Sequence, residues 1–203
     1  MDIGRHLRCT AFEGTQCVAS GELAQVALKA KDVVDGGKQI LIFDDVTSEA
    51  VEVDFRGTAA DVLSRLARIE SKETDSAPGP EAEGPRGPGR PKLGVVAREV
   101  TLLPRHWDWL NAQPGGASVA LRKLVETARR ANEGKDRVRR AQEAAYRFMS
   151  VMAGNQPGFE EATRALFANE EQRFEQMIEP WPVDVRNHAT KLAAVAFANP
   201  VAA

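Results

Sequence analysis

The sequence has few residues of the kinds that build catalytic, metal or disulfide sites. It contains two cysteines, Cys9 and Cys17, and three widely spaced histidines, His6, His106 and His188. Two thiols without histidine or acid partners do not complete a zinc site, so we expect both to behave as small apolar residues. No phosphate-binding loop, dinucleotide fingerprint, nucleophile elbow or metal motif occurs. The sequence therefore predicts no cofactor and no enzyme.

Long apolar stretches are also missing. No run approaches the roughly 18–20 apolar residues of a membrane span. The first residues, MDIGRHLRCTAFEG, lack the apolar core of a signal peptide. We therefore expect a cytoplasmic protein. Apolar residues still make up 43% of the 203 residues, which is enough for a packed core in one or two domains.

The net charge of −2 hides a strong asymmetry along the chain. Residues 1–85 carry 9 Lys/Arg and 16 Asp/Glu, residues 86–140 carry 13 and 5, and residues 141–203 carry 5 and 8. A basic block between two acidic ones is typical of a segment that binds a polyanion. The alternative is an ordinary solvated helix face.

The pattern of apolar residues predicts an α+β protein in four parts. Residues 1–70 form a small α+β module, and residues 93–140 hold one strand and two helices. Between them, residues 71–92 are rich in proline and glycine and have no aromatic or β-branched apolar residue. Such a segment cannot bury a core, so it predicts a linker. Residues 141–203 form a helical C-terminal region.

Short-range signals place the elements of the two terminal regions. The predicted strands are Arg8–Glu13, Gln16–Ala19, Gln39–Phe43 and Ala50–Phe55. The first two form a hairpin that could bring Cys9 and Cys17 opposite each other. Two N-terminal helices begin at caps Ser20 and Thr58 and end near Asp35 and Arg68. The predicted C-terminal helices are Ala141–Met152, Gly158–Phe167, Glu170–Ile178 and Val183–Phe197.

The basic block contains a strand, a proline, a helix, a turn and a second helix. Arg98–Leu103 is the strand, Pro104 suits the first turn of a helix, and Pro114-Gly115-Gly116 is the turn. Ser118 is a predicted N-cap for a second helix that runs to about Arg130. This pattern resembles the ribbon-helix-helix DNA-binding domain over residues 98–130. A lone strand is unstable in water, so we expect a homodimer in which two copies of the strand pair.

The resemblance implies which residues contact DNA. A two-stranded ribbon fits the major groove, with Glu99 and Thr101 on its outward face. The start of the second helix at Ser118 would bind a phosphate. Arg129 and Arg130, near the end of that helix, would contact the phosphate backbone.

A basic arm precedes the predicted strand. The segment Pro85–Lys92 reads PRGPGRPK, and its Gly89-Arg90-Pro91 core followed by Lys92 resembles an AT-hook. In that motif an extended arm places arginine in the narrow minor groove of AT-rich DNA. Arg86, Arg90 and Lys92 are the candidate contacts. The alternative is a proline-rich linker that happens to carry arginine.

A further resemblance covers nearly the whole chain. Residues 93–110, LGVVAREVTLLPRHWDWL, and residues 145–154, AYRFMSVMAG, resemble an uncharacterised bacterial family known only as a domain of unknown function. That family implies no activity. The functional prediction therefore rests on the ribbon-helix-helix-like segment and the basic arm. Together they favour a duplex-DNA-binding protein, of the transcriptional regulator or nucleoid-associated type.

Two other interpretations remain open. The first is a protein-interaction adaptor or antitoxin-like partner binder, which would use the N-terminal module or the C-terminal helices with an exposed Trp181. The second concerns Asp44 and Asp45, which follow a predicted strand. Two such carboxylates could bind magnesium or serve acid–base chemistry, but adjacent acids in this position are usually turn residues.

Overall fold

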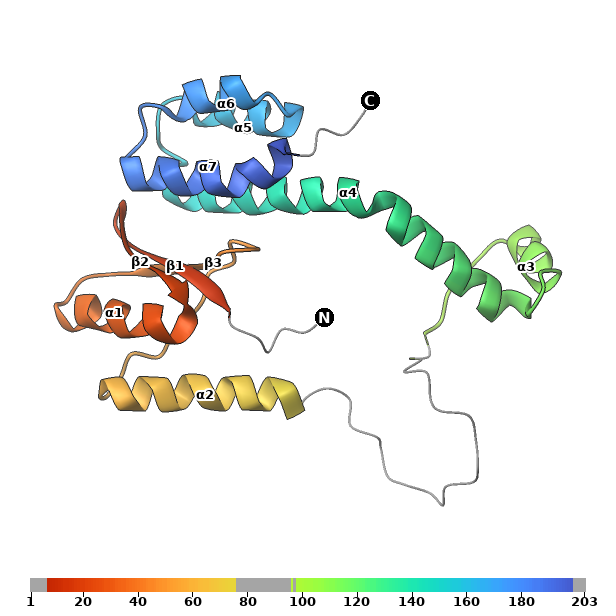
Figure 1. Ribbon diagram of the computed structural model, residues 1–203, viewed down its shortest axis with the longest axis horizontal. Helices are drawn as coiled ribbons and strands as arrows, with labels where there is room; N and C mark the ends of the chain where they lie inside the picture. The colour runs from red at the N-terminus through yellow and green to blue at the C-terminus, as the bar shows by residue number, and fades with distance from the viewer. Residues whose placement is uncertain (1–6, 76–95, 97, 199–203) are drawn as a thin grey trace, which may run out of the picture. The chain divides into compact units, whose positions relative to one another are not determined.

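The computed structural model describes residues 7–75, 96 and 98–198. Residues 1–77 and 134–203 form one compact unit, which we call the terminal unit, and residues 78–133 form the central unit. A small three-stranded sheet and a helical C-terminal region confirm the α+β class. Figure 1 shows the elements in chain order. No helix in the described ranges is long and apolar enough to cross a membrane.

The sheet is antiparallel and has the order β2-β1-β3. Its strands are β1 (Arg8–Glu13), β2 (Gln16–Glu22) and β3 (Leu41–Asp44). The predicted hairpin is confirmed, with Gly14 at a φ of 55° in its turn. Its register pairs Cys9 with Gly21 and Cys17 with Phe12. The two thiols therefore do not face each other, since Cys9 is buried and Cys17 is exposed.

Helix α1 (Leu23–Asp35) covers part of the sheet and ends at Gly36-Gly37, as predicted. Its predicted start was wrong. Ser20 lies within β2, where its hydroxyl is within hydrogen-bonding distance of Thr10 Oγ1, at 3.0 Å. The longer second strand keeps Ser20 paired with its neighbour across the hairpin, which competes with a role as helix cap.

Helix α2 (Ala59–Asp75) begins with the predicted cap. Thr58 N–H donates to Asp61 Oδ2 at 2.8 Å, and Asp61 N–H donates back to Thr58 Oγ1 at 3.3 Å. This reciprocal pair satisfies two N–H groups at the start of the helix. The helix is longer than predicted and includes the first five residues of the predicted linker. The rest of that linker, residues 76–92, lies outside the described residues.

The predicted strand Ala50–Phe55 was wrong beyond its first residue. Ala50 pairs with Phe43 in an isolated bridge, and Val51 N–H donates to Ile42 O at 2.8 Å. Residues 52–55 then leave the edge of β3 without forming a strand. Val51, Val53 and Phe55 instead pack against buried residues of the sheet and α1, and Val53 and Phe55 also pack against residues of α2. The alternating apolar residues therefore reflect packing against the sheet and the two helices rather than a fourth strand.

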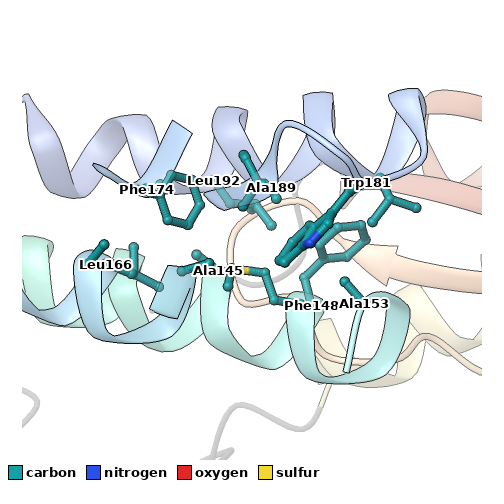
Figure 2. Packing of buried hydrophobic residues seen from close by; sticks show 14 of the residues in the cluster. Ala145, Phe148, Ala153, Leu166, Phe174, Trp181, Ala189 and Leu192 are labelled. Atoms are coloured by element: carbon teal, nitrogen blue, oxygen red, sulfur yellow. The ribbon is translucent and has the colours of Figure 1, made fainter. Parts of the chain in front are cut away.

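Three of the predicted C-terminal helices are confirmed to within two residues. They are α5 (Phe159–Ala168), α6 (Glu171–Ile178) and α7 (Val183–Phe197). They pack with the C-terminal part of α4 (Gly116–Met152), and α7 lies alongside that part (Figure 1). Figure 2 shows the apolar core between these helices.

The same core includes the sheet. The Phe148 ring of α4 lies 5.4 Å from Phe12 of β1 and 5.3 Å from Phe43 of β3, between ring centroids. Trp181, predicted to be exposed, is 3% exposed, and its Nε1–H donates to Pro157 O at 2.9 Å. The two terminal regions, predicted as separate modules, thus share one core.

Candidate nucleic-acid interface

The central unit is built from a helix, a glycine turn and the first part of α4. Pro104 begins α3 (Pro104–Asn111), as predicted, and Leu110 is buried at 3% exposure. Gly115 and Gly116 have φ values of 86° and 74° in the turn. A side chain at Gly115 would place its Cβ 3.1 Å from Val119 Cβ. The turn between the two helices is confirmed, and it requires glycine at this position.

Helix α4 differs from the prediction at both ends. It starts at Gly116, so Ser118 lies inside its first turn and is not the N-cap. The N–H groups of a first helical turn have no acceptor within the helix, so Ser118 stays at an end suited to anions. The helix continues for 37 residues to Met152, without the predicted break between Arg130 and Ala141.

The predicted strand Arg98–Leu103 is absent from the single chain. Residues 98–103 form no strand, and Glu99 and Thr101 are both exposed in this segment. Val100, which the strand pattern places inward, is 53% exposed. No strand of the described residues pairs with this segment, and an isolated strand does not persist in water.

Arg129 and Arg130 both contact Glu126, one turn earlier on α4. Arg129 donates from Nη2 to Glu126 Oε1 at 3.0 Å, and Arg130 donates from Nε to the same oxygen at 2.9 Å. These hydrogen bonds lower the pKa of Glu126. The arginine side chains are 72% and 75% exposed. Exposed pairs of this kind contribute little stability, so both guanidinium groups are free to exchange Glu126 for a phosphate.

The structure adds basic residues that the sequence analysis missed. Arg105 and His106 are exposed on α3, and Arg122 and Lys123 are exposed on α4. Arg122 Nε donates to Ser118 O at 3.0 Å, which places its guanidinium over the first turn of α4. The sequence already showed these basic residues at the outward positions of the two predicted helices, and this spacing could have identified them as candidates.

The predicted contacts do not converge on one point. Ser118 and Arg129 are eleven residues apart on one helix, a rise of about 16 Å. Such a spacing suits a line of phosphates rather than a pocket for one anion. Arg86, Arg90 and Lys92 of the basic arm lie outside the described residues.

Apolar side chains of the central unit are exposed. Leu124 and Val125, which the helical pattern places inward, are 48% and 63% exposed, and Trp109 is 53% exposed. Among the described residues of this unit, the buried apolar side chains are Leu110 and Ala120. The described residues of this unit therefore bury little apolar surface among themselves.

Asp44 and Asp45 are occupied by partners of the fold. Asp44 Oδ1 accepts the N–H groups of Val46 and Thr47 at 2.7 and 2.6 Å. Asp45 accepts from Thr10 Oγ1 at 2.6 Å and from Lys191 Nζ at 3.0 Å. Asp44 therefore acts as a turn residue. In the described parts of the chain, no three His, Cys, Asp or Glu side chains are placed to hold a metal ion.

These features define a mixed α+β protein with a helical C-terminal region and a basic helical pair in its centre. Comparison with known proteins identifies the family. The chain belongs to the family described as uncharacterized protein conserved in bacteria (DUF2239), which matches residues 8–193. No curated protein and no solved structure matches the chain.

Proposed function

We propose that the protein binds duplex DNA as a homodimer through its central unit, as a transcriptional regulator or nucleoid-associated protein. Residues 98–103 of two copies would pair as an antiparallel ribbon in the major groove. Thr101 and Glu99 would face the bases. Arg129, Arg130 and the first turn of α4 at Ser118 would contact phosphates, and Arg86, Arg90 and Lys92 would extend the contact into the minor groove.

One observation carries this proposal. The central unit exposes Val100, Trp109, Leu124 and Val125 in the single chain, each at 48% or more. Exposed apolar side chains in such a small unit favour a partner surface. A second copy of this chain provides both the apolar faces and the strand that residues 98–103 lack.

Charge supports a nucleic acid as the ligand of that dimer. Residues 98–133 carry six Lys/Arg and four Asp/Glu, and the preceding arm adds three basic residues and no acid from Arg86 to Lys92. Glu99 and Thr101 offer few base contacts, so affinity should come mainly from phosphates. We expect modest sequence selectivity and a steep salt dependence.

Fluorescence anisotropy with AT-rich and GC-rich duplexes of equal length tests this function. With about five phosphates neutralised per protomer, the log–log salt slope of a dimer should be on the order of −9. The double change Arg129→Ala and Arg130→Ala should make this slope shallower by about 3.6, because a dimer loses four phosphate contacts.

A matched control lies in the terminal unit. Arg164 and Arg173 also share one carboxylate, that of Glu161. Replacing both with alanine removes the same charge from the chain but should leave DNA affinity unchanged. A slope near zero, or no binding to either duplex at low salt, refutes the proposal. That result would favour the protein-interaction adaptor, with the exposed apolar residues binding a different protein.

A further inference from the structure

Helix α7 carries a stripe of polar residues that runs from buried to exposed positions beside the β1–β2 hairpin. Asp184, Asn187, His188 and Lys191 follow the spacing i, i+3, i+4 and i+7, so they share one face of the helix. All four line a pocket of about 230 Å³ whose opposite wall is the β1–β2 hairpin, including Thr10 and Ser20. A polar stripe between a helix and a sheet is therefore a candidate binding site.

A partly buried hydrogen-bond chain holds the cationic end of this pocket. Asp45 is 8% exposed at its side chain and accepts from Lys191 Nζ at 3.0 Å. Its other oxygen accepts from Thr10 Oγ1, which lies 3.0 Å from Ser20 Oγ. An ammonium group has three donors, and Asp45 uses one. The Lys191 side chain is 56% exposed, so its remaining donors are available to a ligand.

The anionic end is Asp184. Its Oδ2 accepts the N–H of Cys17 at 2.9 Å, which fixes the carboxylate against β2. Its second oxygen keeps its acceptor capacity. Asp184 and Lys191 are seven residues apart, so their backbone positions differ by a rise of about 10.5 Å. A molecule that carries both an ammonium and a carboxylate group can pair with both side chains.

His188 lies between the two charges on the same face. It is 6% exposed, and its Nε2 has no hydrogen-bond partner among the described residues. Its ring packs on Phe148 and Phe12, with centroids 4.5 and 5.5 Å away. A buried polar nitrogen without a partner is rare in native proteins and costs about 1–3 kcal/mol. Because Nε2 itself is buried, the His188 ring lines the pocket between the two charges without offering that nitrogen to a ligand.

We propose that this pocket binds a small zwitterion, either a free amino acid or a comparable ammonium carboxylate. Lys191 binds the carboxylate, and Asp184 binds the ammonium group. The site belongs to the terminal unit and does not depend on DNA binding by the central unit.

Isothermal titration calorimetry and ¹H–¹⁵N correlation spectra of the full chain test the proposal. The probes are L-alanine, L-serine and 4-aminobutyrate, with propionate and propylamine as analogues that carry a single charge. At least one zwitterion should bind saturably and shift the amide signals of residues 10–20 and 184–191. Each analogue should bind at least tenfold more weakly, because it leaves one charge of the pocket unpaired.

Variants assign the two ends of the ligand. Lys191→Met and Asp184→Asn should each weaken binding tenfold or more, while the exposed controls Lys29→Met and Asp32→Asn should leave it unchanged. The spectra report whether each variant is folded. The analogue series uses the unaltered chain, so it decides the question even if a variant unfolds. Equal binding of propionate or propylamine, or no binding of any zwitterion at about 10 mM, overturns the proposal.

Discussion

At the scale of single residues, His188 connects burial to pH-dependent stability. Burial lowers the pKa of His188 to about 4. The charge of Asp45 opposes this shift, and the charge of Lys191 adds to it. The unfolded chain, with an imidazole pKa near 6.5, therefore binds a proton first as the pH falls. Stability should decrease between about pH 6.5 and pH 4, by about 3 kcal/mol in total.

Urea unfolding at pH 7.5, 6.5 and 5.5 measures this effect above the range in which most carboxylates titrate. His188→Phe keeps an aromatic ring in the core and should remove most of the dependence between pH 6.5 and 5.5. His106→Gln changes an exposed histidine of α3 and should leave the pH dependence of stability unchanged. A dependence that is the same in the wild type and in His188→Phe would contradict the assignment.

Replacing each of two glycines with alanine should change the stability of the protein in opposite directions. Gly115 has a φ of 86°, and a Cβ there would lie 3.1 Å from Val119 Cβ, which is closer than most such contacts. Gly115→Ala should therefore destabilise the turn by about 1–2 kcal/mol. Gly134 lies inside α4, and no atom lies within 4 Å of the position that its Cβ would occupy, so Gly134→Ala should stabilise the protein by up to about 1 kcal/mol. Denaturation followed by circular dichroism compares the two, and equal signs would be inconsistent with these backbone conformations.

At the scale of secondary structure, α4 links charge pairing to the proposed function. Glu126 holds Arg129 and Arg130 in the free protein. Glu126→Gln should release both guanidinium groups and raise duplex affinity about three- to tenfold at low salt, because one repulsive charge is also removed. Fluorescence anisotropy measures the change. Glu161→Gln, which releases Arg164 and Arg173 in the terminal unit, should not change the affinity.

Ion pairs between neighbouring turns also help to explain why α4 is so long. Pairs spaced three or four residues apart join Glu126 to Arg129 and Arg130, and Arg139 to Asp136 and Glu143. Each pair stabilises an exposed helix by about 0.2–0.5 kcal/mol. Together with the absence of proline after Pro114 until Pro157, they allow the helix to continue through Gly134. The prediction of a break between Arg130 and Ala141 underestimated the stabilisation that these pairs give to the helix.

At the scale of the whole molecule, the shared core predicts that the N-terminal region does not fold alone. Phe12 and Phe43 of the sheet pack on Phe148 of α4. A fragment of residues 1–75 would expose both rings to water, so we expect little dispersion in its amide spectrum. Adding a fragment of residues 134–203 should restore the dispersion. A well-dispersed spectrum of residues 1–75 alone would show that the N-terminal region is independent.

The proposed dimer makes a second prediction at this scale. Sedimentation should show a dimer at micromolar concentrations. Val125→Glu places a charge among the exposed apolar side chains of the central unit and should shift the protein to monomer, with a loss of DNA affinity. Val183→Glu is the matched control, since Val183 is 57% exposed in the terminal unit and Val125 is 63% exposed. A folded wild-type monomer would exclude the ribbon.

The sequence alone determined the elements that depend on local chemistry. Gly36-Gly37 ends α1, Thr58 and Asp61 cap α2, Pro104 begins α3, and Gly115-Gly116 separates α3 from α4. Each of these signals acts within four residues, so it does not depend on distant parts of the chain. The hairpin and the α+β class followed from the same kind of signal.

Only the tertiary structure decided how distant segments combine. It placed Trp181 in the core, paired Asp45 with Lys191, and joined Phe12 to Phe148 across 136 residues of sequence. It also placed Cys9 opposite Gly21 and Cys17 opposite Phe12, so the two thiols are not neighbours across the hairpin. Periodicity shows which face of an element is apolar but not which other element covers it. That choice depends on shape and long-range packing, and it is the reason that the polar face of α7 could not be recognised from its spacing alone.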